Sequence, residues 1–260
     1  MKNTISLLII VCCLLFCLTS CSPTPAEIVA EAMTQTKELN AYEAQLVADV
    51  HTSYYGQDFD VLTVIDYAVV EALTRNPKFY AEIYIQAMDK NTEWKVFFEN
   101  GWIYTLNNGN GYKESAHENS DDSNDITGVF DDFFRELPES LYEDLTMTTH
   151  KDGSRSVSLE IPNKTFKEVF DVAVRIAEDS IKGDFIYSDP YFKNAVATIT
   201  VKDGYIYMYE IAFDMLVNVN QSRVTVEVKE TLLIKNKGDD VQIEPMEGYE
   251  DFPLFTLITQ

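Results

Sequence analysis

The sequence predicts an α+β fold, in which helices pack over one face of a curved antiparallel sheet that forms an incomplete barrel. Three observations predict this fold. Apolar and polar residues alternate along several long segments, two-residue turns containing glycine join pairs of these segments, and three amphipathic stripes with helical spacing interrupt them. Because each helix must bury its apolar stripe, the most economical arrangement lays the helices across the sheet.

The first segment is an apolar leader that ends at a cysteine. Lys2 supplies a positive charge, and residues 5–18 form an apolar stretch shorter than the roughly 20 residues that a transmembrane helix needs. Leu18-Thr19-Ser20-Cys21 resembles a bacterial lipobox, which implies that residues 1–20 are a lipoprotein signal peptide and that the thiol of Cys21 carries diacylglycerol. We therefore expect a lipid anchor on the extracytoplasmic face of the bacterial cell membrane. An ordinary secretory signal, cut elsewhere, is the alternative.

Composition excludes several classes of function. All four cysteines lie in the leader or at its end, so residues 21–260 are expected to fold without disulfides, thiol catalysis or zinc–thiolate sites. A chain of this length can instead bury enough apolar surface to be stabilised by its core. The net charge of −23 repels nucleic acid and anionic lipid headgroups. We interpret this acidity as a source of solubility at an exposed cell surface.

The first element after the cysteine is predicted to be a helix. Thr24 can cap it, Pro25 suits its first position, and Glu27 completes a capping box. Apolar residues follow at helical spacing: Ile28, Val29, Ala32, Met33 and Leu39. Only residues 22 and 23 separate the cap from Cys21, so we expect the folded domain to lie close to the bilayer.

Three strands are expected next. Residues 42–50 alternate between apolar and polar positions, as in a sheet with one face in water. Residues 79–85, which follow Asn76-Pro77, alternate in the same way and carry large side chains on both faces. Residues 61–73 fit either a helix or a strand, and their β-branched content favours a strand.

Asparagine or aspartate followed by glycine predicts three hairpin turns in the rest of the chain. The dipeptides are Asn100-Gly101, Asp152-Gly153 and Asp203-Gly204, with flanking strands over 94–106, 145–161 and 197–209. A last antiparallel pair covers 205–217 and 223–235, where alternate residues from Val224 to Ile234 share one face. The pentapeptides Asn-Gly-Trp-Ile-Tyr and Asp-Gly-Tyr-Ile-Tyr are equivalent, which fits either an internal duplication or a coincidence.

Two more helices and an acidic loop complete the predicted elements. Apolar residues recur with helical spacing over 126–137 and over 166–181, the second behind a capping box of Thr165 and Glu168. The acidic loop near 116–125 is interpreted as a flexible, solvated linker. As an alternative, residues 121–132 resemble a calcium-binding loop, although Ile126 stands where the turn glycine belongs.

Several short motifs resemble lipoproteins of the lipoprotein-carrier superfamily, which includes the LolA, LolB, LppX and LprG types and uncharacterised Gram-positive lipoproteins. The motifs are Cys21, the helix with Ala-Glu-Ala-Met, a strand starting at Tyr42, Asn76-Pro77-Lys78-Phe79, the Asn-Gly-Trp-Ile-Tyr hairpin and Tyr112-Lys113. The resemblance covers most of residues 21–260 and implies a single domain: an incomplete barrel closed by helices, with a hydrophobic cavity that holds acyl chains. It assigns no ligand-binding residues.

The sequence therefore predicts non-catalytic binding of a lipid or another hydrophobic molecule. Aromatic residues occur on the helix stripes and on both faces of strands, and helices over a half-open sheet can leave an apolar cavity. One alternative is that these rings form an ordinary core. Another is an interaction or sensor module whose sheet contacts a protein or glycan. Tyr205, Tyr207 and Tyr209 are expected to share one face, for such a contact or as a cross-strand ladder.

No enzyme, cofactor or metal site is predicted. His51, His117 and His150 lack metal-ligand spacing, no nucleophile-elbow motif accompanies them, and each is interpreted as an ordinary surface residue. The many carboxylates make any chosen catalytic pair uninformative. The expected partners are the membrane, through the anchor, and a hydrophobic ligand; no nucleic acid is expected, and no protein partner is predicted.

Overall fold

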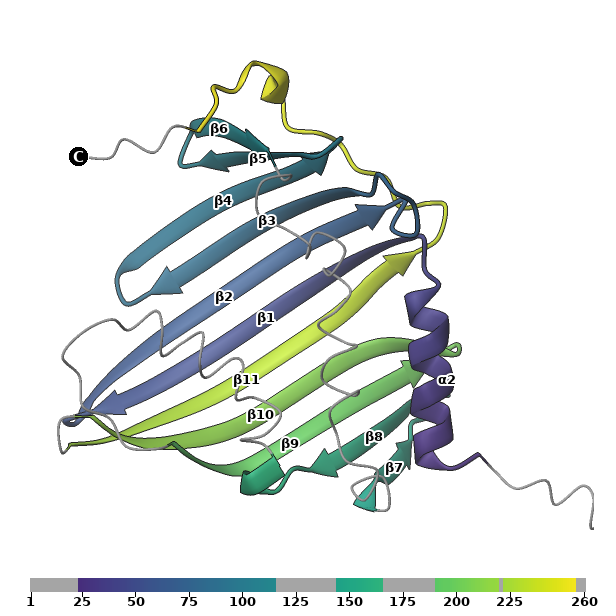
Figure 1. Cartoon of the computed structure of the whole chain (residues 1–260). Helices are drawn as coiled ribbons and strands as arrows, with labels where there is room; N and C mark the ends of the chain where they lie inside the picture. The colour runs from purple at the N-terminus through teal and green to yellow at the C-terminus, as the bar shows by residue number, and fades with distance from the viewer. Residues whose placement is uncertain (1–22, 116–143, 166–189, 220–221, 256–260) are drawn as a thin grey trace, which may run out of the picture.

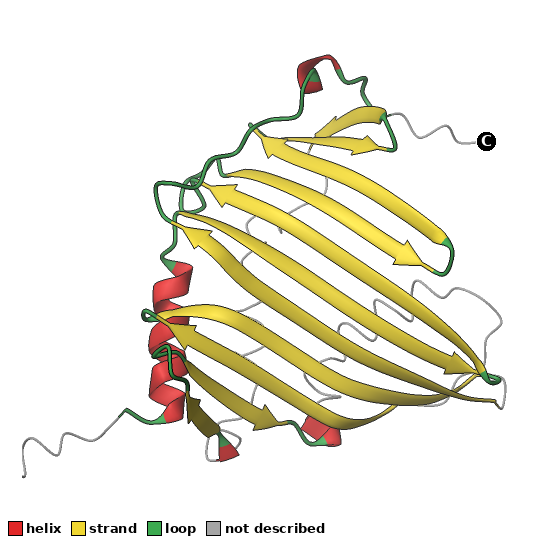
Figure 2. Ribbon diagram, turned by 180° about the vertical axis from the view of Figure 1, so that it is seen from behind, coloured by secondary structure: helices red, strands yellow, loops and turns green. Residues whose placement is uncertain are grey.

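The structure, a computed structural model, describes residues 23–115, 144–165, 190–219 and 222–255. These residues form a single eleven-stranded antiparallel sheet with the strand order β6-β5-β4-β3-β2-β1-β11-β10-β9-β8-β7 (Figures 1 and 2). The end strands β6 and β7 lie at opposite margins and do not pair with each other. The antiparallel sheet is thus confirmed, and the predicted incomplete barrel is an open sheet.

The strand bounds follow the alternation of apolar and polar residues. In chain order they are β1 (Ala41–Tyr54), β2 (Gln57–Val70), β3 (Lys78–Ala87), β4 (Lys90–Glu99), β5 (Trp102–Asn107), β6 (Asn110–Ser115), β7 (Thr146–Thr149), β8 (Arg155–Glu160), β9 (Tyr191–Lys202), β10 (Tyr205–Val219) and β11 (Ser222–Lys237). Residues 61–70, for which helix and strand were both compatible with the sequence, lie in β2, so the prediction of a strand is confirmed there.

The two halves of the chain meet at the centre of the sheet. Strands β1 to β6 follow one another in sequence on one side of the sheet, and strands β7 to β11 do so on the other. The join is the pairing of β1 with β11, which runs from Tyr42 opposite Lys237 to Tyr54 opposite Val224. The centre therefore consists of the longest strands, while the margins consist of short ones.

Two predicted turns are confirmed by their backbone angles. Asn100 and Gly101 have φ values of 53° and 77° between β4 and β5, and Asp203 and Gly204 have values of 53° and 82° between β9 and β10. Positive φ at both central residues is what a type I′ turn requires, and it matches the twist of the paired strands. The Asp152-Gly153 turn also joins two antiparallel strands, β7 and β8.

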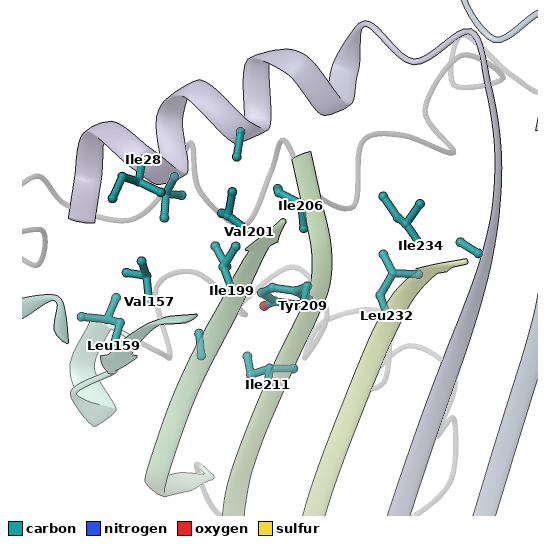
Figure 3. Packing of buried hydrophobic residues seen from close by; sticks show 14 of the residues in the cluster. Ile28, Val157, Leu159, Ile199, Val201, Ile206, Tyr209, Ile211, Leu232 and Ile234 are labelled. Carbon is teal, nitrogen blue, oxygen red and sulfur yellow. The ribbon is translucent and has the colours of Figure 1, made fainter. Parts of the chain in front are cut away.

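Helix α2 (Pro25–Lys37) packs across the ends of β9 and β10, and we call the side of the sheet that it contacts the helix face. The predicted capping box is present: Glu27 donates its backbone N–H to the Thr24 hydroxyl, and the Glu27 carboxylate accepts from the Thr24 N–H at 2.7 Å. Ile28, Val29 and Ala32 are buried against strand residues such as those labelled in Figure 3. This contact forms the main core of the described chain.

A β-bulge in β10 corrects one prediction about the sheet. The register between β9 and β10 shifts between Ile206 and Met208, so Ile206 and Tyr209 both lie in the core on the helix face (Figure 3). Tyr205 and Tyr207 instead contact Lys237 and Lys202, respectively. The prediction that Tyr205, Tyr207 and Tyr209 share one face was wrong, because the extra bulge residue reverses the alternation.

The segment after β11 runs along the ends of the neighbouring strands to the β6 margin (Figure 1). We call the side of the sheet away from α2 the opposite face. Tyr249, in the 3₁₀ turn η3 (Tyr249–Asp251), contacts the rings of Phe97 and Tyr104 edge-on at centroid distances of 5.0 and 4.8 Å. Leu254 then forms a parallel bridge with Lys113 of β6. The C-terminal segment thereby covers the backbone edge of β6, which would otherwise be open to pairing with another chain.

Several predicted features lie outside the described residues. They are the signal peptide and Cys21, the acidic loop 116–125 with the alternative calcium loop 121–132, the helical stripe 126–137 and residues 166–181 of the other stripe. Helix α2 is accordingly the element that bears on the prediction of helices over one face. Within the described ranges, no helix is long and apolar enough to span a membrane.

Candidate functional site

The candidate site is the part of the helix face that extends beyond α2. In an antiparallel sheet, residues directly opposite each other across neighbouring strands point to the same side, so the register defines continuous rows. The first row is Ile83, Ile65, Leu46, Leu232, Tyr209, Ile199 and Val157. The second row is Ile85, Thr63, Ala48, Glu230, Ile211, Ala197 and Leu159. The third row is Ala87, Val61, Val50, Val228 and Phe213.

These rows are buried at one end and partly exposed at the other. Leu232 and Ile199, near α2, are 4% and 2% exposed. Farther from the helix, the apolar side chains of Leu46, Val50 and Phe213 are only half-buried. The half-buried set continues through β2 and β3 and comprises Val61, Ile65, Ile83, Ile85 and Val228. The helix face is therefore an apolar surface that the sheet and α2 cover incompletely.

Aromatic residues lie at the end of the helix face from which β1 starts. The rings of Tyr42 and Tyr67 meet edge-on with centroids 6.2 Å apart, and Tyr67 also contacts Phe79 at 6.0 Å. Burial raises the pKa of Tyr42 to about 12 and raises the pKa of Tyr67 as well, so both phenols stay neutral near pH 7. Trp94 of β4 lies farther along the same face, opposite Ile83, and is 38% exposed.

One carboxylate interrupts the apolar rows. Among the described positions in the three rows, Glu230 is the charged one, and Ala48 and Ile211 lie directly opposite it on β1 and β10. The Glu230 side chain has no hydrogen bond or ion pair with another described residue, and burial raises the pKa of its carboxyl. Tyr209 lies one row away, where burial and, to a lesser extent, the charge of Glu230 raise the pKa of its phenol. Glu230 is thus a polar position within an apolar surface.

The opposite face carries a polar groove of about 790 Å³ between the sheet and the C-terminal segment. Its sheet side holds two groups of paired charges. Lys95 donates to Glu82 at 2.6 Å, and the same carboxylate accepts from the Tyr80 hydroxyl at 2.6 Å. Lys235 pairs with Asp66, which also accepts from Gln45. Both lysines are therefore paired, but Glu43, Glu244 and Glu247 also line the groove, so its lining holds more acidic than basic side chains.

The histidines that are described take part in surface contacts. His51 lies on the opposite face of β1, 2.6 Å from Asp60, and this hydrogen bond is the main cause that raises the pKa of the imidazole. The Nε2 atom of His150 lies 2.7 Å from the Ser156 hydroxyl. His117 lies outside the described residues. The described part of the chain holds no cluster of three or more histidine, cysteine, aspartate or glutamate side chains that could bind a metal ion.

The structure places few of the predicted site residues. Cys21, the predicted lipidation site, lies outside the described residues, and no ligand-binding residue was predicted from the sequence. Glu230 was missed as a candidate even though the alternation from Val224 to Ile234 already placed it on the same side as five valine, leucine or isoleucine residues. The signal was a single charged residue on the apolar side of a strand. Periodicity alone does not distinguish such a residue from an ordinary exception to the alternation.

Comparisons with known proteins give distant structural similarities. No protein-family model matches the chain, and no curated protein sequence matches it. The crystal structure of LprF from Mycobacterium bovis is similar at a TM-score of 0.43 and 15% identity, covering 86% of this chain and 97% of that one. A DUF1329 family protein from Desulfovibrio piger is similar at a TM-score of 0.27 and 11% identity, covering 84% of this chain and 96% of that one. A β-barrel-like protein of DUF1849 from Brucella abortus has a TM-score of 0.22 and 9% identity, over 76% of this chain and 100% of that one. At these scores the family resemblance stays a prediction from the sequence.

Proposed function

We propose that this protein binds a lipid or another hydrophobic molecule against the helix face, without catalysis, while a lipid at Cys21 anchors it to the extracytoplasmic face of a bacterial cell membrane. The observation that carries the binding proposal is the set of half-buried apolar side chains that continues beyond α2 across the rows of the sheet. Soluble proteins rarely expose a continuous apolar patch of more than a few hundred Å² unless something binds there.

The chemistry of the rows suits acyl chains better than a reaction. Valine, isoleucine and leucine dominate the face, and they offer no nucleophile, acid or base to a bound molecule. Each apolar group that leaves water on binding contributes about 25 cal/mol per Å² of buried area. An elongated hydrophobic molecule lying along the rows would gain this contribution over its whole length.

The binding proposal is tested by placing a polar side chain in the rows. Val228 and Lys229 are neighbours in β11 on different faces of the sheet, so Val228→Asn and Lys229→Asn form a matched pair. We expect Val228→Asn to weaken binding of a neutral fluorescent apolar probe about tenfold, corresponding to roughly 1.4 kcal/mol. Lys229→Asn should leave the affinity unchanged, and circular dichroism confirms that both variants fold. Equal affinities in the two variants, or no extractable lipid and no probe binding by the wild type, contradict the proposal.

The anchor is tested separately in living bacteria. Cys21→Ser removes the thiol that would carry diacylglycerol, so we expect the variant to leave the membrane fraction. Cys17→Ser is the matched control, because this residue lies in the proposed signal peptide and should not affect anchoring. If Cys21→Ser stays in the membrane after salt washing, the anchor is wrong.

The groove on the opposite face favours a second candidate function, contact with a protein or a glycan. Its sheet wall presents the Tyr80 ring beside paired charges, a combination that suits polar partners. In this case Tyr80→Ser should abolish cross-linking of the protein to a surface partner on intact cells, while Val228→Asn should leave the cross-link in place. The reverse result favours the helix face.

A further inference from the structure

We infer that the ligand of the helix face carries a positively charged amine, which the carboxylate of Glu230 binds in the middle of the apolar rows. This inference rests on the proposed function, because it names the chemical class of the molecule that the same face binds. Beyond the proposed function, it assigns the recognition of the ligand to one residue and gives the ligand a positive charge. The ligand is thus a cationic amphiphile, with an apolar chain and an amino group.

The register of the sheet surrounds Glu230 with apolar side chains. Its neighbours along β11 on the same face are Val228 and Leu232, and its partners on the adjacent strands are Ala48 and Ile211. None of these four side chains can donate a hydrogen bond or balance a charge. Ala48, on the β1 side, also ends at Cβ and has no polar atom in its side chain.

The placement of the other charges on β11 makes Glu230 an exception. Arg223, Glu227 and Lys229 alternate on the opposite face, as a strand with one wet side requires. Lys229 pairs there with Glu210 of β10 at 3.0 Å. Glu230 alone among the charged residues of 222–230 points to the apolar side, and a one-residue slip of β11 would move it, with Val228 and Leu232, to the opposite face. The register therefore fixes this carboxyl on the helix face.

Burial of an unpaired carboxylate is unfavourable, and this cost points to a cationic partner. A carboxylate that leaves water without a counter-charge costs several kcal/mol, unless it binds a proton or a cation. Burial raises the pKa of Glu230, which is the first of these responses. An ammonium group supplies the second, since it has three donors and a positive charge.

The charge of the whole chain supports an amine over an acid. The net charge of −23 attracts cations and repels fatty-acid anions at long range. The strong acidity of the chain, which does not suit a carrier of ordinary anionic lipids, is consistent with a cationic ligand.

The test compares three amphiphiles that share one chain length and differ in charge. Dodecylamine, dodecanol and dodecanoate are titrated against the purified full chain loaded with the neutral probe N-phenyl-1-naphthylamine. We expect dodecylamine to displace the probe at a concentration about tenfold lower than dodecanol, as one partly buried ion pair of roughly 1.4 kcal/mol predicts, and dodecanoate to be the weakest. Glu230→Gln should reduce dodecylamine to the level of dodecanol and leave dodecanol unchanged.

Glu227→Gln is the matched control, because Glu227 lies on the same strand but on the exposed opposite face. It removes the same amount of charge and should keep the preference for the amine. If dodecylamine and dodecanol displace the probe equally from the wild type, or if Glu230→Gln keeps the preference, the role of Glu230 is overturned while hydrophobic binding stands. If the probe and all three amphiphiles fail to bind, the proposed function itself is overturned.

Discussion

Thr36 and Ile206 are joined by a hydrogen bond that ties the only helix–strand core of the described residues together. The backbone N–H of Ile206, which lies next to the bulge in β10, donates to the Thr36 hydroxyl at 3.0 Å. The same hydroxyl donates to the carbonyl of Ala32 one turn earlier in α2, at 2.7 Å. A single side chain therefore satisfies a strand donor and links it to the helix.

This relationship predicts the effect of Thr36→Val, which keeps the shape of the side chain and removes the hydroxyl. The Ile206 N–H then loses its acceptor inside the core, so we expect a loss of about 1 to 3 kcal/mol in the free energy of unfolding. Thr34→Val is the control, because the Thr34 hydroxyl donates only to Ala30 on the exposed side of α2. Urea unfolding measures both variants; equal stabilities would contradict a structural role for the bond.

The close contact between Gly111 and Phe252 helps to hold the C-terminal segment on β6. A Cβ atom at residue 111 would meet the Phe252 ring at 2.6 Å, so Gly111→Ala must displace the ring. The Lys113 amide donates to the Pro253 carbonyl, and the Phe255 amide donates to the Lys113 carbonyl. In Gly111→Ala we expect both amides to exchange with solvent at least about tenfold faster than in the wild type.

Native-state hydrogen exchange measures this change. Asn110→Ala is the control, because its side chain lies exposed in the same hairpin and away from the ring. Slow exchange at both amides in Gly111→Ala would indicate that the segment does not depend on this contact.

Phe97 belongs to a second core, on the opposite face of the sheet. Its side chain is 2% exposed, between β4 and the C-terminal Tyr249, so Phe97→Ala should leave a cavity and cost about 3 to 5 kcal/mol. Leu73→Ala changes a side chain that is 62% exposed and should cost no more than about 0.5 kcal/mol. Thermal and urea unfolding compare the two; a small effect at Phe97 would mean that the C-terminal segment is not packed there.

Glu230 predicts an unusual dependence of stability on pH. Burial raises the pKa of this carboxyl in the folded chain above its ordinary value of 4.5, so the folded chain keeps the proton to higher pH than the unfolded chain. Its contribution to stability is therefore complete below the unfolded pKa and is lost as the pH rises through the folded pKa. Without ligand, Glu230→Gln should match the wild type at pH 4 and be more stable than it at pH 8.

Urea unfolding at a series of pH values measures this difference. Glu227→Gln, on the exposed opposite face of β11, should show no such gain between pH 4 and pH 8. A Glu230→Gln variant that is less stable than the wild type at pH 8 would mean that the carboxylate already has a favourable partner within the protein.

Much of the sheet could be predicted from local patterns. The alternation of apolar and polar residues predicted β1, β3 and β11. The Asn100-Gly101 and Asp203-Gly204 turns predicted the β4–β5 and β9–β10 hairpins, because positive φ at two successive residues is compatible with few other structures. The cap at Thr24 was equally local, since its partner Glu27 lies only three positions along the chain. The bulge at Ile206 to Met208 was not predicted, because the pattern of apolar and polar residues in β10 does not show how this strand is paired with β9.

The sequence by itself determined which segments extend, where hairpins turn, where α2 begins, and that alternate residues from Val224 to Ile234 share one side of a strand. These features depend on neighbours within a few residues. Tertiary structure alone decided that β1 pairs with β11 and that the C-terminal segment crosses to β6. It also decided that Glu230 lies among apolar partners from three strands, because contacts between distant residues arise from packing and register and not from local preference.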